Sequence, residues 1–584
     1  MIKKLFRQML LTQILSSMTV MLCMLIDSIM IGRFLGVDSM TAYGLATPVL
    51  LVFAALGSML SAGVQVMCGK TMGAGDKKGT DACFTMSVVL VVMISVIGLI
   101  AVIGFTDPIC HLLGADKKGT DSEVFRLTKD YLRGFIIGAP AFLSAQVMVP
   151  YMQISGSRVR LVVAVAAMTV GDIVFDAVNV FVIKQGTFGM GLASSLSYYI
   201  AFVIGVIYFF KKDCIFRFRL AYAKFKVFTR LIIDGFPTLI NQVSLVLLTF
   251  VLNKMLLDIQ GNLAVAAYSV ISTTGNICYA FSSGIASVAL MLSSILYSDE
   301  DTTALRSLVK TMLFYASAIC ATVTAISLIA AKPMVMLFLT DTGAKEMAIS
   351  GFRLFVLSLV PCAINTSLKN YYQGIDRTRF TRFISVLQNF LLPAGSAFIL
   401  SRFMGIKGIW LGFLFGECEA LLFICAVVFI RKKAVRFDTS TFSMLSDDYG
   451  AKPEDCFEMT IISSQQVIEA SKQASEFCKK HGTSSRLGSL IALCIEEMAN
   501  NTVKHGFEGE NDDKHSIDIR LMLKQDETVI RMRDNCRNFD PVNYLELHED
   551  DDKFSHIGIR MIMKMVKDAN YVNSLGLNNL TLRI

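Results

Sequence analysis

The sequence predicts an α-helical polytopic membrane protein with about 12 transmembrane helices in two six-helix repeats, followed by a C-terminal α/β sandwich domain. Three observations lead to this fold class. Long apolar runs recur over the first three-quarters of the chain, landmarks in them recur at a nearly constant offset, and the composition changes abruptly near residue 436. Of the 584 residues, 54% are hydrophobic and 17% are charged, whereas a soluble domain carries charge on about a quarter of its residues.

Apolar runs begin near the N-terminus and continue to Ile430. Three of them cover Leu10–Met30, Met86–Gly104 and Ala316–Ala331 with its flanks. Runs of about 20 residues are long enough to cross a hydrocarbon layer of about 30 Å as helices. Because a cleaved signal peptide would be a single short stretch at the start of the chain, the repetition indicates a multi-pass membrane domain.

Clusters of Lys and Arg alternate with weakly charged loops between the apolar runs. Cytoplasmic loops of membrane proteins carry the excess of basic residues, so we assign the strong clusters to the cytoplasmic side. This assignment predicts that both termini and the C-terminal domain are cytoplasmic, with the chain in the plasma membrane. The strong clusters lie at residues 3–7, 70–78, 158–160, 211–230, 377–382 and 431–436.

An internal repeat divides the membrane domain. At an offset of 225 residues Gly36 aligns with Gly261 and Pro108 with Pro333, and the offset drifts to about 220 further along. Six helices per half is an even number, so both halves enter the membrane from the same side. A parallel repeat of this kind predicts a substrate site between the halves near the middle of the membrane.

The charge balance reverses where the apolar runs end. Residues 437–584 carry 17 basic and 25 acidic side chains, so the 55 basic and 47 acidic residues of the whole chain leave a net charge of +16 for the first 436 residues. That basic excess belongs to membrane-flanking loops and does not indicate a nucleic-acid surface. The predicted domains are the first membrane repeat at 1–220, the second at 221–436 and the C-terminal domain at 437–584.

Three acidic residues lie inside apolar segments of the first half. An unpaired charge such as Asp27 costs at least about 2.5–3.5 kcal/mol at the centre of a membrane helix. Asp172 and Asp176 are four residues apart, so both carboxylates lie on one helix face. Two such groups cannot both ionise cheaply, and one is expected to bind a proton or share a cation. The alternative is a set of hydrogen bonds that pack helices together.

Five segments of the membrane half, among them Tyr371–Gly374, resemble the multidrug and toxic compound extrusion (MATE) family. Ile26–Leu50 resembles the family's first helix and loop, and Gly69–Asp76 resembles its loop after the second helix. Asp172–Asp176, DIVFD, resembles a fifth-helix motif, and Gly405–Trp410 also fits. The resemblance implies a V-shaped antiporter of two bundles that exports organic, xenobiotic compounds against H⁺ or Na⁺.

By the same resemblance Asp27, Asp172 and Asp176 are the cation-coupling candidates. The sequence departs from the family pattern at two places. Asp172 stands where the family usually has Asn, and this difference could change which ion is coupled to transport. Ser293–Asp301, SSILYSDED, occupies the position in the second half where a glycine-rich loop is expected.

In the C-terminal domain, Glu497, Asn501 and His505 follow each other at intervals of four on a predicted helix, so they line one face. A carboxylate, an amide oxygen and an imidazole on one face suit the positioning of water and of a hard cation such as Mg²⁺. The alternative is a solvated polar helix face. Spacing alone favours that alternative, and the surrounding motifs favour the first reading.

Four motifs in order resemble the Bergerat-type ATPases, which include histidine kinases and anti-sigma-factor serine kinases. They are Ile495–Phe507, Arg533–Pro541, His556–Ile562 and Gly576–Leu580. The resemblance implies a histidine kinase-like domain that binds ATP and Mg²⁺ as cofactors.

Residue roles follow from this resemblance. Glu497 would activate water or an acceptor hydroxyl, and Asn501 would bind Mg²⁺. The ATP-binding residues would be Asn501, His505, Asp534, for the adenine amino group, and Gly558, in the phosphate lid. The chain departs from the family where glycines are expected, at Cys536, Asn538 and His556. Both an ATPase and a serine kinase activity therefore stay open for this domain.

Two functions fit these observations. The first is a cation-coupled antiporter of organic compounds with a cytoplasmic ATP-binding regulatory domain. The second is a membrane signalling protein whose transporter-like half senses a ligand and whose C-terminal domain binds or phosphorylates a cytoplasmic regulator. The expected partners are an organic small molecule, the lipid bilayer and a cytoplasmic regulatory protein, with no nucleic acid.

Overall fold

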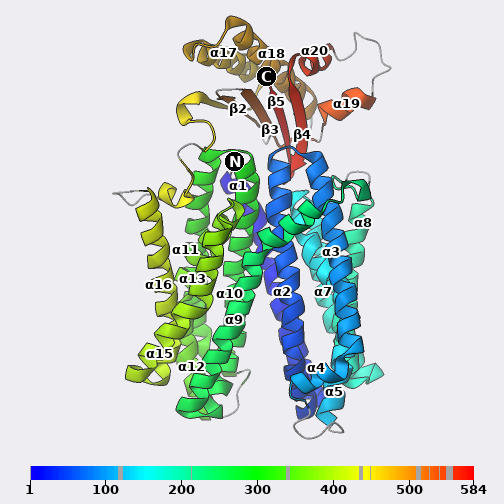
Figure 1. Cartoon of the computed structure of the whole chain (residues 1–584), viewed down its shortest axis with the longest axis vertical. Helices are drawn as coiled ribbons and strands as arrows, with labels where there is room; N and C mark the ends of the chain where they lie inside the picture. Colours follow the sequence, from blue (N-terminus) through cyan, green and yellow to red (C-terminus); the bar gives the residue numbers. More distant parts are fainter. Residues whose placement is uncertain are drawn as a thin grey trace.

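The architecture comes from a computed structural model of the 584-residue chain. It consists of a helical membrane domain with a C-terminal domain seated on one end of it (Figure 1). We call that end of the helices the domain-facing end. The structure describes residues 2–115, 123–211, 214–336, 338, 342–432, 439–446, 449–507, 515–524, 527–537, 539–547 and 557–584.

The membrane domain contains two groups of helices, which we call the first and second bundles. The first bundle comprises α1 (Ile2–Met30), α2 (Val37–Gly73), α3 (Lys77–Gly104), α4 (Thr106–Leu112), α5 (Glu123–Ile136), α6 (Ala139–Ile154), α7 (Arg158–Val178) and α8 (Gly186–Phe209). The second comprises α9 (Phe225–Gln260), α10 (Asn262–Ser298), α11 (Thr302–Met336), α12 (Thr342–Val356), α13 (Leu359–Gly374), α14 (Thr378–Val386), α15 (Leu392–Met404) and α16 (Ile406–Lys432).

Helix length and composition confirm a multi-pass membrane fold. Within the described residues, 10 helices are long and apolar enough to span a membrane, and the number rises to 12 if each of two bent pairs counts as one span. The bent pairs are α5 with α6, at 48°, and α12 with α13, at 46°. The predicted total of about 12 spans is therefore reached by pairing short helices at a bend.

The two bundles contact each other closely towards the domain-facing end. A Cβ added to Gly63 of α2 would lie 2.2 Å from the carbonyl oxygen of Leu231 in α9, and one added to Gly73 would lie 2.3 Å from that of Ile295 in α10. Glycine is required there because the backbones approach too closely for any side chain. Lys70 of α2 also forms an ion pair of 2.5 Å with Asp376, which follows α13.

The C-terminal domain is an antiparallel sheet covered on one face by helices, as the sequence predicts. Its described strands follow the order β1-β2-β3-β5-β4. They are β1 (Cys456–Ile461), β2 (Ile517–Leu523), β3 (Thr528–Asp534), β4 (Asp568–Ser574) and β5 (Leu577–Arg583). The helices are α17 (Ser464–Lys480), α18 (Ser485–Gly506), the short α19 (Pro541–Leu547), which was not expected, and α20 (Ile557–Met565).

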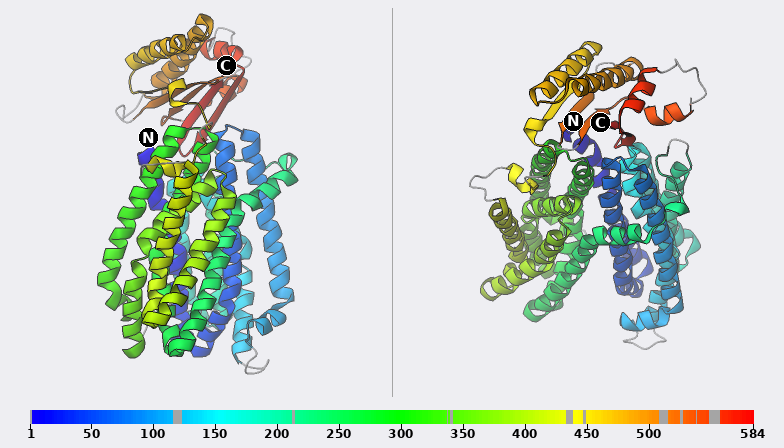
Figure 2. Two further views of the ribbon diagram at one scale, coloured as in Figure 1. Left: turned by 60° about the vertical axis from the view of Figure 1, so that its left-hand side comes forward. Right: turned by 45° about the horizontal axis from the view of Figure 1, so that its top comes forward.

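Strand alternation gives the sheet two different faces. Ile519 of β2 and Ile530 of β3 are buried in the core that α17, α18 and α20 cover. Arg520, Arg531 and Arg533 occupy the intervening positions, so they point to the opposite face. That opposite face lies against the membrane domain, and the helices lie on the far side (Figure 2).

Candidate transport and nucleotide sites

The three membrane carboxylates predicted from the sequence come together in the first bundle. Asp27 comes from α1, whereas Asp172 and Asp176 come one turn apart from α7. All three are buried, at 6%, 1% and 0% exposure. They lie near enough for their charges to interact. Ser194 of α8 donates a hydrogen bond of 3.2 Å to Asp27 Oδ2, so three helices contribute to one polar centre.

This carboxylate centre has more acceptors than donors. Among the described residues, no donor reaches Asp27 Oδ1, Asp172 Oδ2 or either side-chain oxygen of Asp176. Buried oxygens without partners are costly, and they are the groups that a proton or a cation would satisfy. In the same described part of the chain, no group of three or more His, Cys, Asp and Glu residues is arranged to hold a metal ion.

Asn179, which extends the polar face of α7 in the sequence, has a different role. Its Nδ2 donates to the carbonyl oxygen of Gly186 over 3.0 Å, and its Oδ1 accepts from the backbone N–H of Gln185 over 3.2 Å. Both polar atoms therefore hold the connection between α7 and α8 in place. The structure assigns Asn179 to this turn and leaves the three aspartates as the unsatisfied group.

A second buried charge cluster lies in the second bundle and was missed by the sequence reasoning. Lys369 of α13 donates from Nζ to Gln388 Oε1 over 3.0 Å and to Asn241 Oδ1 over 2.5 Å. Gln388 Nε2 in turn donates to Glu417 Oε2 of α16 over 3.0 Å, and Asn365 Nδ2 donates to the same oxygen over 2.8 Å. The available signal was a Lys in one predicted membrane segment and a Glu, two residues before Glu419, in another.

The candidate nucleotide site lies where β3 ends and β5 begins, beside α18. Asp534 is the last residue of β3 and is 9% exposed. Its Oδ1 accepts from Asn578 Nδ2 over 2.8 Å and from the backbone N–H of Cys536 over 2.9 Å. Burial raises the pKa of Asp534, and these donors oppose that rise.

The other predicted nucleotide residues lie on α18 and α20. Glu497 and Asn501 are partly buried, whereas His505 is exposed. Gly558 lies in the first turn of α20, and a Cβ added to it would be 2.1 Å from Glu497 Oε2. The structure therefore brings Gly558 of α20 next to the Glu497 carboxylate of α18.

The departures from the glycine pattern have different outcomes. Cys536 packs against the end of α18, where a Cβ added to Gly506 would lie 2.8 Å from its Cβ. Burial first, and then the Asp534 carboxylate, raises the pKa of the Cys536 thiol to about 12. Asn538 and His556 lie outside the described residues. The loop after β3 is thus tied to α18 through a side chain where the related domains have glycine.

Comparison with protein families identifies both parts of the chain. The MatE family model matches residues 13–178 and 237–399, which together make up more than half of the 584 residues. The family model described as the histidine kinase-like ATPase domain matches residues 463–584.

Relatives in the curated proteins resemble the membrane part. The multidrug export protein MepA of Staphylococcus saprophyticus is 22% identical over 409 residues, which cover 69% of this chain and 89% of that protein. The protein of the same name from Staphylococcus aureus strain NCTC 8325 is 21% identical over 403 residues, covering 68% of this chain and 87% of the relative.

Solved structures share the fold of the membrane part. A multidrug resistance MATE family transporter in an outward-facing conformation gives a TM-score of 0.69 at 22% identity, covering 74% of this chain and 97% of the other. A transporter of the MOP superfamily from Pyrococcus furiosus also gives 0.69, at 21% identity, covering 76% of this chain and 97% of the other. The chain therefore belongs to the MatE family, the multidrug and toxic compound extrusion proteins, and carries a histidine kinase-like ATPase domain at its C-terminal end.

Proposed function

We propose that the membrane domain exports organic, xenobiotic compounds in exchange for H⁺ or Na⁺, with both termini in the cytoplasm. The observation that carries this proposal is the buried centre of Asp27, Asp172 and Asp176, whose side-chain oxygens outnumber the donors that reach them. Binding of a cation at one time and its release at another would change the charge of a site shared by three helices. A change in charge at this site alters the relative free energies of the conformations in which the bundles are arranged differently.

The proposed substrate class has two supports. The relatives named multidrug export protein cover most of the membrane domain. A cavity of about 50 Å³ in the first bundle is lined mainly by apolar side chains, among them Met148, Met152 and Met168. Methionine is unbranched and polarisable, so such walls adapt to apolar groups of different shape.

We further propose that the C-terminal domain binds ATP with Mg²⁺ and regulates transport. Asp534 would accept from the adenine amino group, Asn501 would hold Mg²⁺, and Glu497 would orient a water or hydroxyl. His505 and Gly558 would lie beside the phosphates. The residues fit a nucleotide because Asp534 is a buried carboxylate at a strand end. Gly558 brings the N-terminus of α20 to Glu497 of α18, and backbone N–H groups at a helix N-terminus suit phosphate.

The transport proposal is tested in proteoliposomes that contain the full chain. Efflux of the cationic dye ethidium should depend on an imposed H⁺ or Na⁺ gradient, and the two ions are imposed separately to identify the coupling ion. Collapse of the effective gradient with an ionophore should abolish accumulation of the dye. Accumulation that persists without any gradient and requires ATP would overturn the proposal.

A second function is favoured by the orientation of the ATPase domain. Its helix layer, which includes α18, lies on the side of the sheet away from the bundles (Figure 1). In that case the membrane half would sense a ligand and the domain would bind or phosphorylate a cytoplasmic regulator. Pull-down from a cytosolic extract with and without ATP, with the Asn501→Ala variant as control, tests this function. No ATP-dependent partner should appear if transport is the activity.

A further inference from the structure

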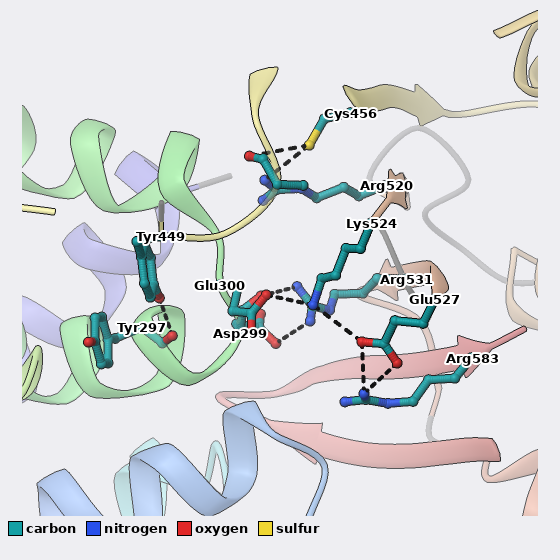
Figure 3. A network of polar contacts seen from close by, with 11 residues as sticks. Tyr297, Asp299, Glu300, Tyr449, Cys456, Arg520, Lys524, Glu527, Arg531 and Arg583 are labelled. Carbon is teal, nitrogen blue, oxygen red and sulfur yellow. Dashed lines mark hydrogen bonds and ion pairs between the residues drawn. The ribbon is translucent and has the colours of Figure 1, made fainter. Parts of the chain in front are cut away.

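The ATPase domain is bound to the second bundle through charge. Asp299, Glu300 and Asp301 form the turn between α10 and α11. Asp299 and Glu300 lie against Arg531 and Lys524 on the basic side of the sheet (Figure 3). Arg531 donates to the carbonyl oxygen of Asp299 over 2.7 Å, and Arg533 forms an ion pair with its carboxylate. These contacts account for the acidic turn that replaces the glycine-rich loop expected from the first half.

Neighbouring contacts extend this acidic turn. Lys524 forms an ion pair of 2.7 Å with Glu300, and Arg520 forms one with Asp301. Burial alone would raise the pKa of Asp301, but Arg520 and Arg533 outweigh it and hold the pKa below its ordinary value. Asp299 is fully buried between the two domains. A buried carboxylate without its cationic partner is destabilising. The acidic turn is therefore stable in this buried position because the ATPase domain supplies the arginines.

The same sheet reaches the first bundle through the β4–β5 hairpin. The backbone N–H of Leu575 donates to the carbonyl oxygen of Ile154 over 2.5 Å, and Arg158 donates to the carbonyl oxygen of Leu575 over 3.1 Å. Ile154 ends α6 and Arg158 begins α7. A Cβ added to Gly156, between them, would lie 2.8 Å from the backbone nitrogen of Gly576.

Leu575 adopts a backbone conformation that leucine rarely takes. Its φ is 59° and that of Gly576 is 77°, so both turn residues have positive φ, where Asn and Gly are the favoured residues. The Leu575 side chain is only 5% exposed and packs in the apolar core of the membrane domain. The strain is offset by burial against the first bundle, which indicates that this tip serves docking.

We infer that the ATPase domain is a bracket that holds the two bundles together at the domain-facing end. Its attachments to the two bundles lie on one sheet. Arg531 and Arg533 are on β3, Leu575 directly follows β4, and β5 is hydrogen-bonded to both of these strands. The bundles cannot separate at this end while both attachments hold. Because alternating access requires the halves of a transporter to rock apart around the substrate, the bracket favours the state closed at this end.

The bracket is connected directly to the candidate nucleotide site. Arg533, which holds the second bundle, is followed by Asp534, and Asn578 lies three residues after Leu575. Asn578 Nδ2 donates to Asp534 Oδ1 over 2.8 Å and to the carbonyl oxygen of Arg537 over 3.2 Å. Adenine at Asp534 competes for this carboxylate, so nucleotide loosens the hairpin and releases the bracket. This step rests on the proposed ATP binding.

The experiment measures the separation of the bundles in the full chain in nanodiscs. Lys78 at the start of α3 and Arg379 at the start of α14, both exposed, are each replaced by p-acetylphenylalanine. A spin label is then attached to the ketone of each introduced side chain. This chemistry leaves the 14 native cysteines untouched. The distance distribution between the two labels is recorded by double electron–electron resonance.

Two variants each break one attachment, Asp299→Asn the one to the second bundle and Leu575→Asn the one to the first. Asp299→Asn removes the charge that Arg531 and Arg533 bind, and Leu575→Asn removes the apolar anchor while it suits the positive φ. Each should raise the ratio of long to short distances by about tenfold or more. Asp107→Asn is the matched control, because it breaks the ion pair of 2.5 Å with Lys129, outside the docking contacts, and should leave the distribution unchanged.

A saturating ATP analogue with Mg²⁺ should shift the distance distribution of the chain without Asp299→Asn or Leu575→Asn towards long distances, as each of the two variants does. Distributions that stay unchanged in both Asp299→Asn and Leu575→Asn would overturn the bracket. A nucleotide that binds by calorimetry without lengthening the distance would overturn the release step. Neither result depends on dye efflux, so a failure of the transport proposal is recognised separately.

Discussion

Asn578 donates a hydrogen bond of 2.8 Å from Nδ2 to Asp534 Oδ1, and this bond joins the start of β5 to the end of β3. Tyr571 and Asn573 of β4 both donate to Asn578 Oδ1, over 2.7 Å and 2.9 Å. Asn578 is therefore held from two sides and fixes the carboxylate that we assign to adenine. The hairpin that docks on the first bundle and the nucleotide site share this one side chain.

Loss of the Asp534 charge should weaken nucleotide binding. Asp534→Asn keeps the shape of the side chain but replaces a charged carboxylate oxygen with an amide group. A hydrogen bond from the adenine amino group to a charged acceptor contributes about 1.5–3 kcal/mol to binding. Isothermal titration calorimetry of the full chain with ATP and Mg²⁺ should show an affinity lower by about tenfold or more. Asp518→Asn, on β2 and hydrogen-bonded to Thr460, is the matched control. Equal affinities in both variants would remove Asp534 from the site.

Removal of a carboxylate from the first-bundle centre should uncouple transport. Asp27→Asn keeps the hydrogen bond available to Ser194 but can no longer bind and release a proton. Efflux of ethidium driven by an imposed gradient should fall about tenfold or more, while dye binding to the purified protein persists. Asp107→Asn provides the control outside the membrane core. Gradient-driven efflux at the normal rate in Asp27→Asn would count against coupling through this group.

Truncation of one member of the second-bundle cluster should destabilise the protein strongly. Lys369→Met leaves Glu417 buried with an uncompensated charge, which costs about 3–5 kcal/mol. The midpoint of thermal unfolding should therefore fall clearly. A double variant, Lys369→Met with Glu417→Gln, should recover part of the loss because neither charge remains. Additive losses in the double variant would show that the two side chains do not interact.

The Cys536 thiol should be unreactive at neutral pH. Its pKa is raised to about 12, so the thiol stays protonated below that pH and the nucleophilic thiolate is scarce. Site-resolved mass spectrometry should show slow alkylation by iodoacetamide across pH 7–9, rising only as the pH approaches 12. The same residue in urea-unfolded protein should react as an ordinary thiol with a pKa near 8.5. Rapid alkylation of the folded chain at pH 8 would contradict this environment.

The sequence by itself determined the class of the protein. Apolar runs long enough to span a bilayer predicted the membrane domain, and the strand and helix patterns predicted the C-terminal sandwich, because periodicity is a local property of the chain. It also showed Asp27, Asp172 and Asp176 as acidic side chains inside apolar segments, since a charge in an apolar run is visible without a fold. Their coupling role stays a prediction. The spacing of Asp172 and Asp176 on one helix was enough to place them together.

Only the tertiary structure decided how distant segments meet. Lys369 and Glu417 lie on different helices, and their shared partner Gln388 reaches both only when the helices pack. The acidic turn at Asp299 looked like a departure from a pattern until the sheet brought Arg531 to it. Contacts between residues more than 200 positions apart depend on how whole domains dock, and no local periodicity encodes that arrangement.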